Sequence, residues 1–253
     1  MISAITSLII WIGVALLVLI WLPLLAIVRL LDPDPAHYNT GKLFRKLGMA
    51  ISRINPNWNI TISGRTDIDD RQPYVVVCNH LSQADIPLIS NLPWEMKWVA
   101  KKPLFEIPVV GWMMRLAGDI SVDRRSKDRG TKTIERGQDY LDLNCSVMFF
   151  PEGTRSRNGG LNRFSHGAFA LAISKDIPIL PLVIDGTQNT LPKNSWKFGQ
   201  AKHIKLRVLE PIDTENIEPE NISELSDKVR SRMAQQLSEW RAKPLKEVDN
   251  MIK

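Results

Sequence analysis

The feature that most constrains the fold is a long N-terminal stretch without charged side chains. Residues 1–28 contain no Asp, Glu, Lys or Arg, and residues 8–31 are dense in Leu, Ile, Val and Trp. About 20 apolar residues are enough for a helix to cross the hydrocarbon core of a bilayer. The stretch is therefore predicted to be a membrane-anchoring helix. Pro23 within it indicates either a kink in a spanning helix or the bend of a re-entrant one.

The basic residues around this stretch predict its orientation. No Lys or Arg precedes it, whereas several follow, namely Arg29, Lys42, Arg45, Lys46 and Arg53. By the positive-inside rule, the body of the protein is expected on the cytoplasmic face of a bacterial-type inner membrane. A secretory signal would need a basic start and a small-residue cleavage site, and neither is visible. The anchor is therefore expected to stay on the mature protein.

The residues after the anchor predict a connector and a second helix. The run Asp32-Pro33-Asp34-Pro35 breaks any helix and acts as a stiff link. Residues 42–53 place apolar side chains on one helical face and cations on the other, as in a helix lying in the membrane interface. An ordinary surface helix packed on the domain is the alternative. We expect an anchor region over residues 1–55 and an α/β domain over residues 56–253.

The composition supports one folded domain with an anionic partner. A chain of 253 residues with 44% hydrophobic side chains is long enough for one large domain plus an appendage. The net charge of +6 suits nucleic acid, an anionic membrane surface or a phosphorylated substrate. Cys78 and Cys145 each lie in or beside an apolar run, so both are expected to be buried thiols in a reducing compartment.

Short apolar runs alternate with helical patterns through the rest of the chain. This alternation predicts an α/β fold on a single mixed sheet flanked by helices. The expected strands are 59–64, 74–78, 96–102, 118–124, 146–150, 177–184 and 205–209, and the expected helices are 85–89, 129–141, 164–174 and 221–243. Residues 103–116 are apolar despite two prolines, and they suit either the core or a face for lipid or an acyl chain.

A histidine follows the run that should form the central strand, Tyr74-Val75-Val76-Val77-Cys78. His80 would therefore lie at the carboxyl end of this strand, where α/β proteins collect reactive groups. Asp85 follows across a strand-to-helix turn, so its carboxylate can orient the imidazole and leave the other ring nitrogen as a general base. The alternatives are that His80 caps the helix, or that Ser82 and Asp85 form a capping box.

A second buried strand ends in a polar turn, Pro151-Glu152-Gly153-Thr154-Arg155. Gly153 lets backbone amides approach a ligand, Thr154 can cap or donate, and Arg155 offers a planar fork suited to phosphate. No internal repeat and no spacing typical of metal ligands is visible in the sequence. Taken alone, this segment could be an ordinary polar turn, but two buried strands that end in a His/Asp set and a Glu/Arg set favour a functional interpretation.

Four motifs in this order resemble the glycerolipid acyltransferase family, and within it the 1-acyl-glycerol-3-phosphate acyltransferases. The motifs are Asn79-His80 through Asp85, Gly118 through Arg124, Phe150 through Arg155, and Ile179-Leu180-Pro181-Leu182. The resemblance covers about residues 74–211, and members of the family also have an N-terminal pair of membrane helices. It implies a membrane-bound acyltransferase that makes phosphatidic acid.

The resemblance implies a role for each residue of these motifs. His80, oriented by Asp85, would deprotonate the free hydroxyl of a lysophospholipid, which then attacks an acyl thioester of coenzyme A or acyl carrier protein. It implies that the acceptor phosphate is contacted by Lys101, Arg124 and Arg155. It also implies that the glycerol end of the acceptor is held by Glu152. Backbone amides in the loop around Gly153 are the candidates to stabilise the oxyanion. No bound cofactor, metal ion or nucleic acid is expected.

One departure from the family pattern leaves alternatives open. The family usually has Phe-Lys-x-Gly after the third motif, whereas this chain has Phe164-Ser165-His166-Gly167. The acceptor could therefore be another lysolipid. A second alternative is a thioester hydrolase that uses Cys78 with His80 as a dyad. A third is a membrane-attached binder of lipid or nucleic acid without enzymatic activity.

Overall fold

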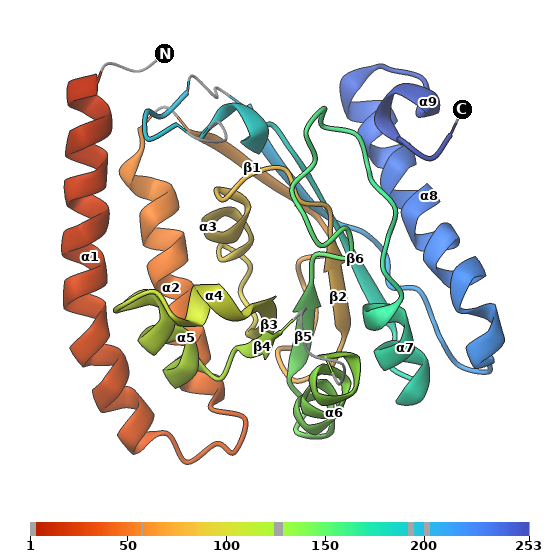
Figure 1. The fold of residues 1–253 in the computed structure, drawn as a ribbon, viewed down its shortest axis with the longest axis horizontal. Helices are drawn as coiled ribbons and strands as arrows, with labels where there is room; N and C mark the ends of the chain where they lie inside the picture. The colour runs from red at the N-terminus through yellow and green to blue at the C-terminus, as the bar shows by residue number, and fades with distance from the viewer. Residues whose placement is uncertain (1–3, 57, 124–128, 192–194, 200–202, 253) are drawn as a thin grey trace.

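The protein forms one mixed sheet flanked by helices, as expected from the sequence. The computed structural model describes residues 4–56, 58–123, 129–191, 195–199 and 203–252 (Figure 1). Within these ranges the sheet has seven strands in the order β1-β7-β6-β2-β5-β3-β4. The strands are β1 Asn59–Gly64, β2 Val75–Cys78, β3 Met96–Lys101, β4 Ile120–Val122, β5 Ser146–Phe149, β6 Ile179–Asp185 and β7 His203–Val208. The strand predicted to be central, β2, is the middle one.

Helices cover both faces of this sheet. The helices of the described residues are α1 Ala4–Leu31, α2 Tyr38–Ile54, α3 Asp85–Ile89, α4 Lys102–Phe105, α5 Val110–Ala117, α6 Arg129–Asp142, α7 Gly167–Ser174, α8 Ile222–Arg241 and α9 Leu245–Val248, with 3₁₀ turns at Thr187–Asn189 and Pro219–Asn221. Alternate residues of β2 face opposite cores: Val75 and Val77 pack with α6, α7 and α8, whereas Val76 and Cys78 pack with α3. Burial on both faces explains why this strand is continuously apolar.

The strand directions bring two loops together. β2 pairs in parallel with both β5 and β6, and β5 pairs in parallel with β3. The loops that leave the carboxyl ends of β2 and β5 therefore meet at one edge of the sheet. β7 is antiparallel to β6 and parallel to β1, so the carboxyl ends of β1 and β7 lie at the opposite edge.

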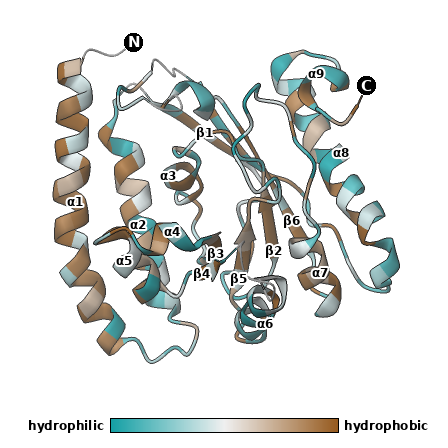
Figure 2. Ribbon diagram, viewed as in Figure 1, coloured by the Kyte–Doolittle hydropathy of each residue, from teal (hydrophilic) through white to brown (hydrophobic). Residues whose placement is uncertain are grey.

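The helix α1 is long and apolar enough to cross a membrane. It runs as one helix through Pro23, and Figure 2 shows apolar residues along its length. Its partners are α2 and α5, with Leu25 fully buried between them. It is tied to the body near its N-terminal end and again in its second half, because the Ser7 hydroxyl accepts the Phe198 N–H at 3.1 Å and the Trp21 indole donates to the Leu43 carbonyl at 2.9 Å.

The expectation that the cations of the second helix face away from its apolar side is wrong for Arg45. Its side chain is only 7% exposed and pairs with Asp119 and Glu95. Glu95 also pairs with the fully buried Lys97 at 3.1 Å. The physical reason is that α2 packs across β3 and α3, where a buried charge is tolerated only with a partner. The domain boundary at residue 55 stays a prediction.

Several predicted ends of elements differ from the structure by a few residues. Lys102 begins α4 instead of ending β3, and α7 begins at Gly167 rather than at residue 164. Ser82 is not the N-cap of α3, since Ala84 occupies that position without a side-chain cap bond. The Ser82 hydroxyl instead accepts the Ala84 N–H at 3.3 Å, within the turn that precedes the helix.

Candidate functional site

The loop after β2 is fixed to the sheet by a buried asparagine. The Asn79 side chain donates to the Ile184 carbonyl at 2.9 Å and accepts the Ile184 N–H at 2.8 Å. Both groups of a fully buried amide are thereby satisfied. His80, the next residue, leaves the sheet from a fixed point.

The His80 ring meets Asp85 across the turn. The distance from Nδ1 to the Asp85 carboxylate oxygen Oδ2 is 2.7 Å, and the Asp85 side chain is fully buried. The same oxygen accepts the backbone N–H groups of Leu81 and Ser82 at 2.7 and 2.9 Å. The loop therefore wraps around an oxygen that can accept a hydrogen bond from Nδ1–H, and in that tautomer Nε2 carries no proton. Because Ala84 and not Ser82 is the N-cap of α3, Ser82 and Asp85 do not form a capping box, and Asp85 instead holds the turn and the ring together.

The His80 ring is also held from the side. It stacks on Phe150 with ring centroids 4.1 Å apart and an interplanar angle of 23°. Its side chain is 18% exposed, so one part of the ring remains open to a substrate. Stacking and the Asp85 contact together restrict both side-chain torsions of the histidine.

The segment after β5 binds both backbone groups of His80. Glu152 Oε1 accepts the His80 N–H at 2.9 Å, and the Ser156 N–H donates to the His80 carbonyl at 2.8 Å. Glu152 Oε2 accepts the backbone and side-chain N–H groups of Asn162 at 3.0 and 2.7 Å. Burial raises the pKa of Glu152, although these hydrogen bonds act in the opposite direction. Both oxygens are used to join the two loops, and the predicted contact with the glycerol end stays a prediction.

The remaining predicted binding residues lie around the same edge. Lys101 ends β3 with an exposed side chain, and Thr154 is exposed in the turn after β5. Arg155 is half-buried, and its guanidinium has no hydrogen-bond or ion-pair partner among the described residues. Gly153 has φ of 65°, a left-handed conformation that favours glycine. Arg124 lies outside the described residues.

The hydrogen bonds of the turn after β5 determine which of its backbone N–H groups are open to a ligand. The Gly153 N–H already donates to the Phe150 carbonyl at 2.9 Å, which closes the turn. That amide is therefore not available to a ligand. Within the described part of the chain, the N–H groups of Thr154 and Arg155 have no acceptor, so they are the donors that the turn leaves open.

Two contacts of this site could not be predicted from local sequence patterns. Asn162 lies in a loop ten residues beyond Glu152, and no local pattern connects it with the His/Asp turn. The stacking of Phe150 on His80 likewise depends on the pairing of β5 with β2. Asn79 was the one neighbour that could have been found, because it directly precedes the histidine.

Cys78 has the wrong surroundings for a nucleophile. It is fully buried in the core on the α3 side, and burial raises the pKa of its thiol well above the usual range. A thiol is reactive as its thiolate, which needs cationic and partly exposed surroundings. Cys145 is also fully buried, and burial raises its pKa to about 12.

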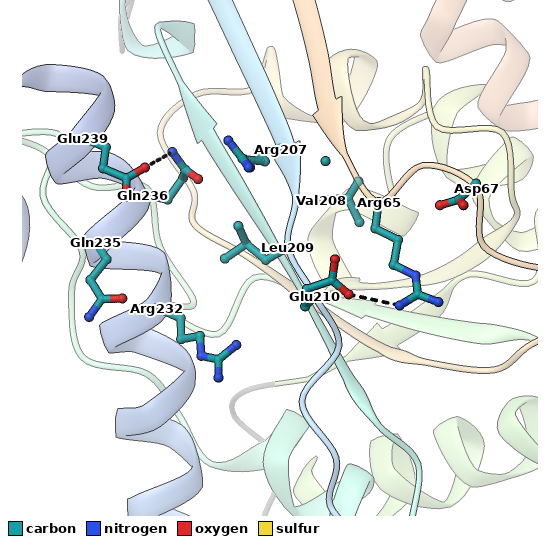
Figure 3. A pocket seen from close by; sticks show the side chains of 11 residues that line it. Arg65, Asp67, Arg207, Val208, Leu209, Glu210, Arg232, Gln235, Gln236 and Glu239 are labelled. Carbon is teal, nitrogen blue, oxygen red and sulfur yellow. Dashed lines mark hydrogen bonds and ion pairs between the residues drawn. The ribbon is translucent and has the colours of Figure 1, made fainter.

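One pocket of the described structure lies away from this site. Its volume is about 590 Å³, and it opens where β1 and β7 end against α8 (Figure 3). Arg65 pairs with Glu210 at 3.0 Å across one side, and Gln236 bonds Glu239 on the other. This is the opposite edge of the sheet from His80. The pocket contains none of the predicted site residues.

Comparison with known proteins identifies the class. The acyltransferase family model matches residues 59–185, half of the chain. The chain belongs to the acyltransferase family.

Particular relatives narrow the resemblance. The chain is 35% identical over 176 residues to mouse 1-acyl-sn-glycerol-3-phosphate acyltransferase alpha, which covers 69% of this chain and 62% of the relative. It is 35% identical over 173 residues to the Saccharomyces cerevisiae 1-acyl-sn-glycerol-3-phosphate acyltransferase, covering 67% and 57%. The match thus spans about three fifths of these relatives. The fold matches the crystal structure of the 1-acyl-sn-glycerophosphate acyltransferase PlsC from Thermotoga maritima, with a TM-score of 0.78, 24% identity and coverage of 95% and 96%.

Proposed function

We propose that the protein transfers a fatty acyl group from an acyl thioester to the free hydroxyl of 1-acylglycerol-3-phosphate, which gives phosphatidic acid. The observation that carries this proposal is the 2.7 Å contact between His80 Nδ1 and the buried Asp85 carboxylate. It gives the protein a general base, while the nucleophile has to come from the substrate. The mouse and yeast relatives are named as 1-acyl-sn-glycerol-3-phosphate acyltransferases, which supports the choice of acceptor.

The reaction follows from this geometry. Nε2 of His80 takes the proton of the acceptor hydroxyl as its oxygen attacks the thioester carbonyl. The imidazolium that forms is stabilised by the Asp85 carboxylate. The tetrahedral intermediate collapses, the carbon–sulfur bond breaks, and the leaving sulfur takes the proton from His80. The products are one ester and one free thiol.

We propose that Arg155, in the turn after β5, binds the acceptor phosphate. The Arg155 guanidinium has no partner among the described residues and offers a bidentate donor set. Lys101 and Arg124 are proposed to bind the same phosphate, and Glu152 to contact the glycerol end. The Thr154 and Arg155 N–H groups are proposed as oxyanion donors. The acyl donor is proposed to be a co-substrate, either acyl-coenzyme A or an acyl thioester of acyl carrier protein.

We further propose that α1 holds the protein in one leaflet of the membrane. Large apolar side chains along α1 are exposed, including Ile9, Leu16, Ile20 and Leu30, and Trp112 is exposed on the neighbouring α5. Because α1 is tied to the body through Ser7 and Trp21, a helix standing across the bilayer would draw charged surface into the hydrocarbon. The basic residues after α1 favour an anionic surface on the cytoplasmic side.

An acceptor panel tests this function. The detergent-extracted protein is given acyl-coenzyme A with lysophosphatidic acid or with lysolipids of larger or phosphate-free head groups, and thiol and lipid product are both followed. We expect phosphatidic acid to form in step with thiol and faster than any other product. A preference for a phosphate-free acceptor would instead support the other lysolipid. Thiol release without lipid product would support the hydrolase, which the burial of Cys78 disfavours.

A further inference from the structure

The C-terminal segment Val248–Asn250 lies against the loop that follows β5. In Figure 1 its blue ribbon runs beside the green loop. The Leu161 N–H donates to the Val248 carbonyl at 2.8 Å, and the Asn250 N–H donates to the Leu161 carbonyl at 2.9 Å. Leu161 is fully buried, so these bonds fix the loop at one register.

A line of hydrogen bonds leads from this segment to the catalytic loop. The Asn250 amide donates to Asn162 Oδ1 at 3.0 Å, and the Asn162 amide donates to Glu152 Oε2 at 2.7 Å. Glu152 Oε1 then accepts the His80 N–H at 2.9 Å. A carboxylate can only accept, so it determines which way the Asn162 amide points, and that amide in turn leaves an oxygen for Asn250. Donors therefore converge on the Glu152 carboxylate from both sides, from Asn162 at one oxygen and from the His80 N–H at the other.

The segment is itself anchored to α8. Asp249 is 2% exposed at its side chain and pairs with Arg230, and Val248 is fully buried. The loop is held from the same helix, because Arg241 donates to the Gly159 carbonyl at 2.9 Å while it pairs with Asp185 at 2.7 Å. The line to His80 thus starts from a rigid element.

Loop and segment also fit closely in space. A Cβ atom on Gly160 would lie 2.7 Å from Asn250 Oδ1, which is closer than real Cβ contacts. Asn250 also exchanges bonds with Asn158 at 2.7 and 3.1 Å. The Asn250 side chain therefore has a defined place although it is exposed.

We propose that Asn250, carried by the segment Val248–Asn250, is a positioning residue that sets the place of His80 through Asn162 and Glu152. This inference rests on the proposed acyl transfer. Asn250 makes no contact with the His80 ring. Its effect is therefore expected through the His80 backbone N–H, and so in how the ring is placed.

The first test is kinetic and uses Asn250→Ala. With one hydrogen bond of the line removed, we expect kcat to fall about three- to tenfold while KM for both substrates is unchanged. Met251→Ala is the matched control, because its exposed side chain adjoins Asn250 and should leave kcat as in the parent. The double variant with Asn162→Ala should be no slower than Asn162→Ala alone. Additive losses would overturn the proposal.

The second test does not depend on activity. The chain has four histidines, so histidine-selective isotope labelling gives a simple NMR spectrum, and the His80 signal is the one lost in His80→Ala. We expect Asn250→Ala to shift this signal and Met251→Ala to leave it in place. An unmoved signal overturns the positioning role, whatever the parent does. If the signal shifts but the parent transfers no acyl group, the proposed function has failed and not the coupling.

Discussion

Replacing Asp85 by Asn removes one charge and keeps the size of the side chain. Three donors converge on Asp85 Oδ2, from His80 Nδ1, Leu81 N and Ser82 N. An asparagine can place its oxygen there, but its NH₂ group then occupies the buried Oδ1 position, which has no partner among the described residues. The variant keeps an acceptor for the ring and loses the charge that stabilises the imidazolium.

The size of the effect follows from the contact. A 2.7 Å contact between Nδ1 and Oδ2 places the two charge centres about 4 Å apart. At an effective dielectric constant of about 20, their attraction is about 4 kcal/mol. Each 1.36 kcal/mol corresponds to about tenfold in rate, so kcat should fall by about 10³. The unpaired NH₂ group should also cost about 1–3 kcal/mol of folding free energy.

The assay is the initial rate of phosphatidic acid formation at saturating acyl-coenzyme A and lysophosphatidic acid. Thermal unfolding of each variant separates lost chemistry from lost folding. Asp139→Asn is the matched control, because Asp139 is 60% exposed and pairs only at the surface with Arg136. A kcat for Asp85→Asn within about tenfold of the parent, in a folded protein, would refute the role of this carboxylate as the orienting charge.

Three further predictions concern other parts of the chain. Gly41→Ala should lower the free energy of unfolding by about 2–3 kcal/mol, since the new Cβ would lie 1.9 Å from the buried Glu95 carboxylate. Thermal unfolding measures this loss. The control is Gly130→Ala, because a Cβ at that position meets nothing within 4 Å. Burial holds the pKa of the Cys78 thiol well above its usual range, so the thiol stays protonated near neutral pH, and alkylation should be slow until the protein unfolds. Cys78→Ala should keep most of the turnover. Arg155→Ala should raise the acceptor KM by about 10- to 100-fold with little change in kcat.

Each of these outcomes has a clear opposite. Equal unfolding temperatures for Gly41→Ala and Gly130→Ala would contradict the predicted clash, because the Glu95 side chain would then have moved aside without a measurable loss of stability. Loss of turnover in Cys78→Ala with a trapped acyl group would move the chemistry to that thiol. A fall in kcat alone for Arg155→Ala would contradict a role in binding the acceptor, and Arg157→Ala, at an exposed neighbour, serves as its control.

The parts of the fold that depend on local pattern could be predicted from the sequence. The apolar run before His80 indicated a strand with both faces buried, and helical spacing from Asp85 indicated the next element. A strand, a turn and a helix limit how far apart these two side chains can be. The contact between them was therefore accessible without tertiary information.

The remaining features depend on contacts between distant segments. Asn162 and Asn250 lie in loops, and only the pairing of Leu161 with Asp249 brings them together. Arg45 has the spacing of a solvent-facing cation, but the acidic partners that allow its burial lie 50 and 74 residues away in sequence at Glu95 and Asp119. Local periodicity contains no information about such distant partners. Neither the contact between Asn162 and Asn250 nor the burial of Arg45 could therefore be predicted.

The most direct test of the account compares the parent protein with His80→Ala in one assay that follows both products. The parent should release one thiol for each phosphatidic acid formed, because the acceptor hydroxyl is the nucleophile. His80→Ala should form neither product above background while unfolding at the temperature of the parent. Phosphatidic acid formation by His80→Ala at a rate near that of the parent would contradict general-base catalysis by His80.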